Sequence, residues 1–388
     1  MSASSPKNKS TICVHSGNYI DPTIQASVTP IFPGTSHAYL DKGQQFYPRY
    51  FNIPNQQAVV KKVCALEYAE DGILFGSGMA AISTTLLSLL RPGDHIVFQE
   101  GLYGGTTQFA RKELSKWGIS YSFTNGNQLA DFEQQIKEHT RMIFIETPSN
   151  PLLAVVDIAL IAALAKSKDL ISVIDNTFAS PINQNPILLG IDVVLHSATK
   201  YLGGHSDICA GLLLTSNALT EQVRQSAKNL GGSMNAQTAS LLERSIKTLH
   251  LRVERQNQNA LALAEFLFEH PEVDQVNYPG LPSHPDHEVA AQQMRGFGGM
   301  LSFELADHLD PVVFQQELDL ILPSMSLGSV ESTICSPYLT SHAYFGKEIR
   351  LQQGISDNLL RLSVGVEDAE ELTEDINAAI RKSERVPG

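Results

Sequence analysis

The sequence predicts an α/β fold, in which a mostly parallel central sheet carries helices on both faces and a smaller C-terminal α+β domain follows. Between about residues 70 and 215, short apolar runs alternate with longer stretches typical of helices. This alternation is the pattern of strand–helix–strand units in a parallel sheet. The apolar runs are continuous, as expected of strands buried on both faces. After about residue 250 the strand candidates become fewer and more widely spaced.

The individual elements follow from these apolar runs and the stretches between them. The strands of the first sheet are expected at 72–75, 95–98, 119–123, 142–146, 171–175 and 192–196. The intervening helices are expected at 79–90, 105–118, 129–140 and 158–169. Beyond them, a long helical stretch is expected at 238–270, strands at 273–278, 299–305 and 359–364, and a closing helix at 366–383. The closing helix has acidic residues early and basic residues late, as the helix dipole favours.

Three parts are expected along the chain: an N-terminal arm at 1–51, a large domain at 52–250 and a C-terminal domain at 251–388. A length of 388 residues fits two to three such parts. The arm is rich in proline and has no regular pattern, so it cannot form a sheet alone. We expect it either to wrap over its own domain or to reach a neighbouring subunit.

The composition excludes several classes of protein. With 28 basic against 41 acidic residues, the formal net charge is −13, which argues against a nucleic-acid binder with its basic face. No stretch approaches the roughly 18 apolar residues of a membrane span, and the first ten residues lack the apolar core of a signal peptide. A cytoplasmic protein is therefore expected.

No metal site is expected. The four cysteines are far apart in the sequence and form no CxxC pair, so we expect buried or half-buried free thiols rather than a zinc or redox motif. His284 and His287 have the spacing of metal ligands but lie in a turn-rich segment. They are interpreted as loop residues.

The strongest chemical motif is HSATKYLGGHSD at 196–207, which follows an apolar run directly. Ligands of open α/β sheets bind beyond the C-terminal ends of the strands. Lys200 is therefore placed where burial can make its amine nucleophilic at neutral pH. The nearby hydroxyls of Ser197 and Thr199 can hold a phosphate. Without this context, a loop lysine is usually solvated and inert.

Two further segments carry polar groups at strand ends. Asp175 ends a fully apolar run, and it could be a helix cap or a partner for a protonated ring nitrogen. The segment FGSGMAAIS at 75–83 passes from a strand into a helix. The N–H groups at the helix start suit a phosphate, although a GSG turn can also be purely structural. A phosphate site, an acidic strand end and a lysine beside two hydroxyls are together what pyridoxal 5′-phosphate (PLP) requires.

The chain resembles the Cys/Met-metabolism group of PLP-dependent enzymes, the trans-sulfuration enzymes, over nearly its whole length. The resemblance rests on motifs in family order: YPR (47–49), GSGMAA (76–81), YGGT (103–106), ETPSNP (146–151), DNTF (175–178), SATKYLGGHSD (197–207), GFGGMLSFEL (296–305), SLGSVES (326–332) and LLRLSVGVED (359–368). It implies PLP-dependent transferase fold type I, similar to aspartate aminotransferase.

The resemblance also implies roles for the cofactor-binding residues. Lys200 would bind the cofactor covalently and move protons between substrate carbons. Asp175 would pair with the ring nitrogen, and Tyr103 would stack on the ring and assist the leaving group. The remaining cofactor contacts would come from Gly78, Met79, Ser197, Thr199 and, near the ring hydroxyl, Asn150.

Further matching positions concern the substrate and a partner subunit. Arg361, Ser326 and Ser341 match the site that binds the carboxylate of a small amino-acid substrate. Tyr47 and Arg49 match an arm that, in this family, completes the phosphate site of a neighbouring subunit. The resemblance therefore implies a homodimer, or a homotetramer built as a dimer of dimers, with shared active sites.

The implied reaction is α,γ-elimination, as in cystathionine γ-lyase, or γ-replacement on a homoserine derivative, as in cystathionine γ-synthase. Methionine γ-lyase and O-acylhomoserine sulfhydrylase are alternatives, and an aminotransferase or a non-catalytic PLP-binding regulator is more remote. Three departures from the family pattern bear on the choice, one of which is a residue inserted after Arg49, in YFNIPN. Gly105 stands where methionine γ-lyases usually carry a cysteine, and Met325 stands where many cystathionine γ-lyases and synthases have a glutamate.

Overall fold

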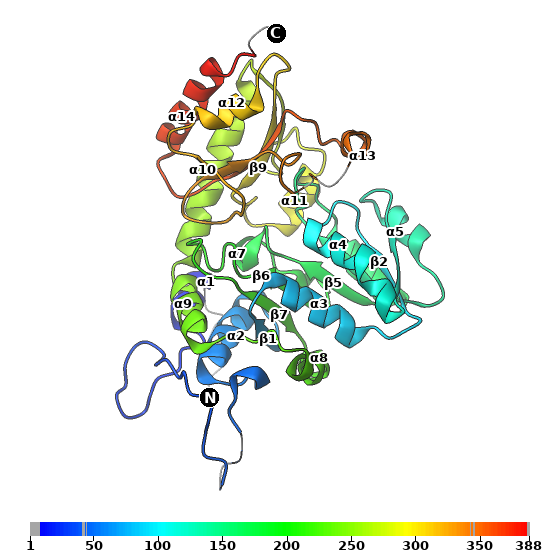
Figure 1. Ribbon diagram of the computed structural model, residues 1–388, viewed down its shortest axis with the longest axis vertical. Helices are drawn as coiled ribbons and strands as arrows, with labels where there is room; N and C mark the ends of the chain where they lie inside the picture. The colour runs from blue at the N-terminus through cyan, green and yellow to red at the C-terminus, as the bar shows by residue number, and fades with distance from the viewer. Residues whose placement is uncertain (1–7, 41–42, 44, 342, 344–345, 386–388) are drawn as a thin grey trace.

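The computed structural model describes residues 8–40, 43, 45–341, 343 and 346–385. Its central feature is a seven-stranded sheet in the order β1-β7-β6-β5-β4-β2-β3 (Figure 1). The strands are β1 (Asp71–Phe75), β2 (His95–Phe98), β3 (Ser120–Phe123), β4 (Thr140–Glu146), β5 (Ile171–Asp175), β6 (Val193–Ser197) and β7 (Gly211–Thr215). The six expected strands are present to within two residues at each end.

β7 is the strand that sequence reasoning missed. It pairs antiparallel with both β1 and β6, so it is the single reversed strand of this sheet. Its sequence, GLLLT, is a continuous apolar run and is fully buried. It follows the glycine-rich segment of the Lys200 motif closely, so the strand was not distinguished from the loop before it.

Helices cover both faces of the sheet, as expected. α3 (Gly78–Leu89) and α8 (Asn217–Leu230) pack on one face, whereas α2 (Pro54–Glu67) and α6 (Ile158–Ser167) belong to the core on the other. Two apolar cores result, one on each side of the strands. Burial of this kind stabilises by about 25 cal/mol per Å² of apolar surface, which fixes the strand ends that carry polar groups.

Several expected helices are shorter than predicted. The stretch at 105–118 forms α4 (Gly104–Lys112) and a 3-10 turn, η2 (Leu114–Trp117), while α5 (Leu129–Gln135) ends well before residue 140. The long helix expected at 238–270 is two helices, α9 (Ala236–Ile246) and α10 (Leu249–Glu269). The apolar period continues through the break at Lys247 and Thr248, and therefore concealed it.

A second sheet has the order β10-β11-β12-β9-β8. Its strands are β8 (Val273–Asn277), β9 (Met300–Leu305), β10 (Leu322–Pro323), β11 (Thr333–Cys335) and β12 (Leu359–Ser363). α10 packs against β8 and β9, and α14 (Ala369–Lys382) packs against α10 and α12 (Pro311–Gln316). The shorter elements are α7 (Ser180–Asn183), η3 (Pro186–Leu189), α11 (His287–Gln293) and α13 (Lys347–Gln352). The short strands β10 and β11 were not predicted, and the domain limits at 51 and 250 stay predictions.

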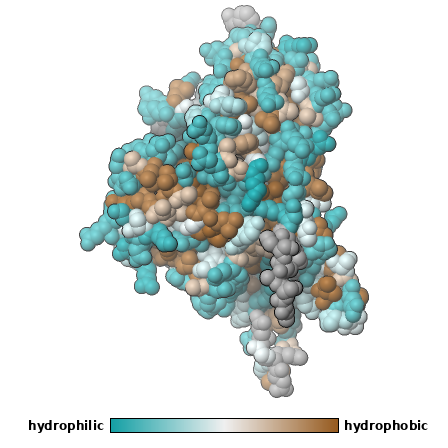
Figure 2. All heavy atoms as spheres, turned by 180° about the vertical axis from the view of Figure 1, so that it is seen from behind, coloured by the Kyte–Doolittle hydropathy of each residue, from teal (hydrophilic) through white to brown (hydrophobic). Residues whose placement is uncertain are grey.

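The N-terminal arm is not wholly irregular. It contains α1 (Lys9–His15), which buries Ile12 and Cys13 in the core of its own chain, and η1 (Pro48–Tyr50). The described residues between α1 and η1 include loops that extend away from the body of the molecule at its lower end (Figure 1). Seen from the opposite side, apolar groups are exposed on this lower end and across the middle of the molecule (Figure 2). The exposed apolar residues of the arm include Ile20, Ile24, Val28, Ile31 and Leu40.

None of the described helices is long and apolar enough to span a membrane. Cys13, Cys64 and Cys335 are buried free thiols, as expected, whereas Cys209 is exposed. The expectation of burial was wrong for Cys209 because this residue lines an open cavity rather than the core.

Candidate functional site

A cavity of about 510 Å³ lies beyond the C-terminal ends of β4, β5 and β6, with the second sheet closing one side. It brings together 11 of the 13 residues predicted for the site. The lining residues are Ser77, Gly78, Met79, Ile82, Tyr103, Glu146, Asn150, Asp175, Thr177, Phe178, Ser197, Thr199, Lys200, Cys209, Met325, Ser326, Leu327, Thr340, Ser341 and Arg361.

Tyr47 and Arg49 do not line this cavity. They lie at η1, where the Arg49 guanidinium is 5.6 Å from the ring centre of Tyr47 and 5.2 Å from that of Tyr50. Arg49 also donates a hydrogen bond to the backbone carbonyl of Lys228 on α8. Within one chain, the arm therefore places these two residues outside the pocket.

Lys200 follows β6 and reaches into the cavity. Its Nζ donates to Ser326 Oγ at 2.8 Å. This hydrogen bond connects the loop after β6 to the loop between β10 and β11 of the second sheet. Burial lowers the pKa of Lys200 to about 8, and the positive charge of Arg361 acts in the same direction. A lysine of this kind has a substantial fraction of free amine near neutral pH and can act as a nucleophile and a base.

Asp175, the last residue of β5, is 5% exposed and lines the cavity. Thr177 donates to Asp175 Oδ1 from both its backbone N–H and its Oγ1, and the same Oγ1 accepts from Ser197 N at 2.8 Å. Burial raises the pKa of Asp175, and the Thr177 hydrogen bonds oppose that shift. A cation beside Oδ2 would favour the ionised carboxylate.

The start of α3 offers backbone N–H groups that could hold an anion. The first N–H groups of a helix have no acceptor within the helix, and here they belong to Gly78 and Met79. A Cβ built on Gly78 would lie 2.9 Å from the Cβ of Ser197, so only glycine allows this close approach. The approach places the helix start beside the hydroxyl of Ser197, and Thr199 lines the same cavity. This arrangement suits a phosphate group.

Arg361 lies on β12 and is 7% exposed. Its Nη1 donates to Asn150 Oδ1 at 2.8 Å and its Nη2 to the backbone carbonyl of Ser326 at 3.2 Å, while Nε is buried without a partner. A buried guanidinium with an unused N–H is suited to a carboxylate ligand. Arg361, Ser326 and Ser341 line the same cavity, and their role in binding a substrate carboxylate stays a prediction.

Glu146, the last residue of β4, was not predicted. Its Oε2 accepts from the backbone N–H of Tyr103 at 2.8 Å, and it lies opposite Asp175 in the β4–β5 register. Burial raises the pKa of Glu146 well above its usual value, and the neighbouring carboxylate of Asp175 adds to the shift. Burial likewise raises the pKa of Tyr103, so its phenol stays protonated. The position of Glu146 at the end of an apolar run, like that of Asp175, was the available signal.

Other lining residues were not predicted as site residues. Thr177 supports Asp175, and the exposed thiol of Cys209 and the thioether of Met325 stand at the cavity. Among the described residues no group of three or more His, Cys, Asp or Glu side chains could hold a metal ion. His284 Nδ1 accepts from Asp286 N at 3.1 Å, and His287 Nδ1 contacts Pro279 O at 2.8 Å.

An open α/β sheet with a lysine, a buried carboxylate and a helix start at its strand ends is the arrangement expected of a PLP-dependent enzyme. The family model described as "Cys/Met metabolism PLP-dependent enzyme" matches residues 10–381. The chain belongs to this family. The predicted resemblance, fold class and cofactor are thereby confirmed, and the protein is an enzyme of the trans-sulfuration group.

Similar proteins support the same conclusion. A cystathionine beta-lyase of Lactococcus lactis subsp. cremoris (strain MG1363) is 44% identical over 96% of this chain and 98% of its own length. A cystathionine gamma-lyase of Bacillus subtilis (strain 168) is 43% identical over 96% and 99%. The crystal structure of cystathionine gamma-lyase from Lactobacillus plantarum complexed with L-serine has a TM-score of 0.94 and 41% identity, covering 97% of this chain and 99% of that chain.

The residues present fit PLP. The helix start at Gly78, with Ser197 and Thr199, suits the phosphate, and Lys200 has a partly free amine for the aldehyde. Burial raises the pKa of Asp175, and a protonated ring nitrogen beside the carboxylate would oppose that shift. Tyr103 has the ring to cover the cofactor face. The cavity therefore has a group for each polar end of PLP.

Proposed function

We propose that the enzyme cleaves the Cγ–S bond of a cystathionine-type amino acid by α,γ-elimination. The observation that carries the proposal is the single cavity in which the amine of Lys200, the carboxylate of Asp175 and the guanidinium of Arg361 converge. The relative at 43% identity that is named cystathionine gamma-lyase supports it, whereas the relative at 44% identity is named cystathionine beta-lyase and favours cleavage at Cβ. γ-Replacement on a homoserine derivative remains the alternative within the same chemistry.

Arg361 is proposed to bind the substrate's α-carboxylate. Its side chain is fixed by Asn150 and by the Ser326 carbonyl, so the guanidinium plane is held before substrate arrives. Nε is the buried donor left for an incoming oxygen. A fixed donor costs little ordering on binding, which favours affinity and orientation.

Replacing Arg361 with lysine tests this role. Lysine keeps one positive charge but loses the planar fork, and it cannot satisfy both Asn150 and a carboxylate. Removing one partner from a buried hydrogen-bonded charge pair costs about 2–5 kcal/mol, so we expect Arg361→Lys to lower kcat/KM by at least about 30-fold, mainly through KM. Steady-state kinetics on cystathionine measure it. An unchanged KM would show that the carboxylate binds elsewhere.

Lys200 and Tyr103 are proposed to move the protons. When bound, PLP supplies the electron sink that makes the substrate's Cα proton acidic. Lys200 Nζ is the base placed to remove this proton and then one from Cβ, because its amine is partly free near pH 8. The protonated Tyr103 phenol can give a proton to the departing sulfur.

The lowered pKa of Lys200 predicts a pH dependence. Lysine accepts a proton only as the free amine, and that fraction rises with pH until it passes the pKa of about 8. We therefore expect kcat to increase about tenfold per pH unit below 8 and to level off above it. Saturating-substrate kinetics between pH 6 and 9.5 check this. A kcat that does not vary below pH 8 would argue against Lys200 as the base.

The reaction's regiochemistry can be read from products. Cysteine, 2-oxobutanoate and ammonia from cystathionine support cleavage at Cγ, whereas homocysteine and pyruvate would show β-elimination and overturn the proposal. Product formed only with an O-acylhomoserine and a thiol together would select the replacement reaction. Methionine is a weaker candidate substrate, because Gly105 stands where methionine γ-lyases usually carry a cysteine.

We also propose that two copies share each active site, with Tyr47 and Arg49 completing a neighbour's phosphate site. The support is that the arm holds these residues outside its own cavity, and that the arm exposes a run of apolar side chains. Free cysteines in the described residues are consistent with a cytoplasmic location, which we propose as well.

Complementation tests the shared site. Arg49→Ala and Lys200→Ala chains should each be inactive alone. In a coexpressed two-fold symmetric dimer, half the assemblies are mixed and contain one intact site of two, which restores about a quarter of wild-type activity. No recovery in verified mixed dimers would mean that each site is built from one chain.

A further inference from the structure

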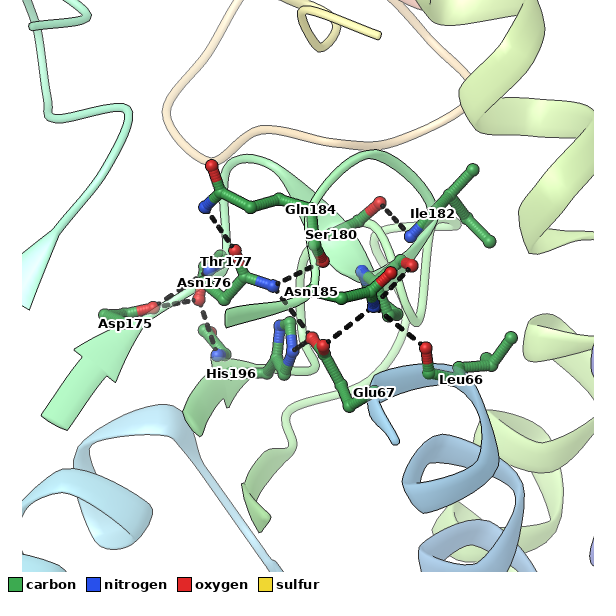
Figure 3. A network of polar contacts seen from close by, with 12 residues as sticks. Leu66, Glu67, Asp175, Asn176, Thr177, Ser180, Ile182, Gln184, Asn185 and His196 are labelled. Carbon is green, nitrogen blue, oxygen red and sulfur yellow. Dashed lines mark hydrogen bonds and ion pairs between the residues drawn. The ribbon is translucent and has the colours of Figure 1, made fainter. Parts of the chain in front are cut away.

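A buried network of polar side chains lies at the ends of β5 and β6, on the face of the sheet opposite the cavity. Its centre is Glu67, the last residue of α2, which is fully buried. Glu67 Oε1 accepts from His196 Nε2 at 2.7 Å and from Asn176 Nδ2 at 2.8 Å, and Oε2 accepts from Asn185 Nδ2 at 3.0 Å. Figure 3 shows the Glu67 carboxylate between these three side chains. None of the four lines the large cavity.

The network touches the neighbours of the predicted cofactor ligands. Asn176 directly follows Asp175, and His196 directly precedes Ser197. Successive side chains of an extended chain point to opposite faces. Asp175 and Ser197 therefore face the cavity, while Asn176 and His196 face Glu67 on the other side.

Hydrogen bonds on both faces of the sheet link the end of β5 to the end of β6. On the cavity side, Thr177 bridges Asp175 and the backbone N–H of Ser197. On the opposite side, Glu67 bridges Asn176 and His196. The network extends to the residue that follows β4, because Gln184 Nε2 donates to Asn176 Oδ1 at 2.8 Å and to Thr147 O at 3.0 Å.

The network is also electrically matched. A buried carboxylate is tolerated when it is paired and fully hydrogen-bonded. The Glu67 carboxylate contacts His196. Burial lowers the pKa of Lys9 on α1 to about 8, and the negative charge of Glu67 opposes that shift. Removing the carboxylate leaves buried donors without an acceptor, which is costly.

We propose that Glu67 is a positioning residue for PLP, which acts through Asn176 and His196 to hold Asp175 and Ser197 in register at the ends of β5 and β6. This inference rests on the proposed placement of the cofactor. It assigns to Glu67 a part in cofactor affinity, although its carboxylate is separated from the cavity by the strands. A purely structural buried residue would affect stability without changing how tightly the folded chain binds PLP.

Glu67→Gln tests the proposal. The glutamine side chain keeps the shape of glutamate but replaces one carboxylate oxygen with an NH₂ group. That group cannot accept a hydrogen bond from His196, Asn176 or Asn185. Apoenzyme would be prepared from each variant and titrated with PLP, following the cofactor absorption band. We expect the Kd for PLP to rise at least tenfold, and kcat to fall more than KM changes. The matched control is Glu243→Gln in α9, another buried carboxylate, which accepts from Thr29 Oγ1 at 2.9 Å and lies outside the network.

The outcomes separate this inference from the proposed function. If wild-type apoenzyme fails to bind PLP, the cofactor placement itself is wrong. If wild type binds and folded Glu67→Gln binds with the same Kd and spectrum, only the role of Glu67 is wrong, even if its melting temperature falls. Should Glu67→Gln not accumulate as folded protein, His196→Ala breaks the same hydrogen bond from the other side. An unchanged Kd for PLP in that variant would equally overturn the proposal.

Discussion

Lys200→Ala is expected to lower kcat/KM by at least about 1,000-fold. The variant loses both the amine that binds the cofactor aldehyde and the base for the substrate protons, and a positioned general base alone contributes about 10²- to 10⁴-fold. No other lysine lines the cavity among the described residues, so the loss cannot be compensated locally. Product formation from cystathionine, with PLP added in excess, is the measurement.

Lys62→Met is the matched control for this loss. Lys62 is a second buried lysine whose pKa burial lowers to about 8, but it lies on α2 and donates to Cys13 O at 3.0 Å and Asn18 Oδ1 at 2.9 Å. Its replacement should lower thermal stability and leave turnover nearly unchanged. Full activity in Lys200→Ala would show that the reaction uses another group.

Asp175→Asn is expected to cause the second largest loss. The amide keeps the hydrogen bonds from Thr177 but carries no charge to match a protonated ring nitrogen. An opposite charge at close range shifts a pKa by about 1–3 units, so we expect kcat to fall by about 10- to 1,000-fold while the cofactor remains bound. Turnover and the pH dependence of the cofactor absorption band measure the two effects.

The control for Asp175→Asn is Asp192→Asn. Asp192 precedes β6 at the end of the strand opposite the cavity and accepts from Ser172 N at 2.8 Å and Ser172 Oγ at 2.7 Å. Its replacement should alter stability alone. Wild-type kcat in Asp175→Asn would exclude a role for the Asp175 charge in the reaction.

The strands of the first sheet were predictable because each is a continuous apolar run of the right length, bounded by turns. β7 was missed for a local reason, since it follows a motif rich in glycine and polar residues. The break between α9 and α10 was missed because the helix stops at Lys247 and Thr248 while the spacing of apolar residues continues across them. Periodicity reports which face is buried, and it does not report a change of helix direction.

The site was predictable where a polar residue stands at the end of a buried strand, as Asp175 and Lys200 do. Glu146 meets the same condition, but nothing in the sequence shows that its carboxylate accepts a hydrogen bond from the backbone N–H of Tyr103. Glu67 lies 108 residues before Asp175 along the chain, so the network around it arises only from tertiary packing. The roles of Tyr47 and Arg49 remain predictions, because they depend on a second copy of the chain.

The most direct test of the account is to identify the residue that carries the cofactor. Holoenzyme would be reduced with borohydride, digested and analysed by peptide mass spectrometry. The account predicts a phosphopyridoxyl group on Lys200 within the peptide that contains Ser197 and Thr199. Labelling of a different lysine, or no label in protein shown to bind PLP, would contradict it.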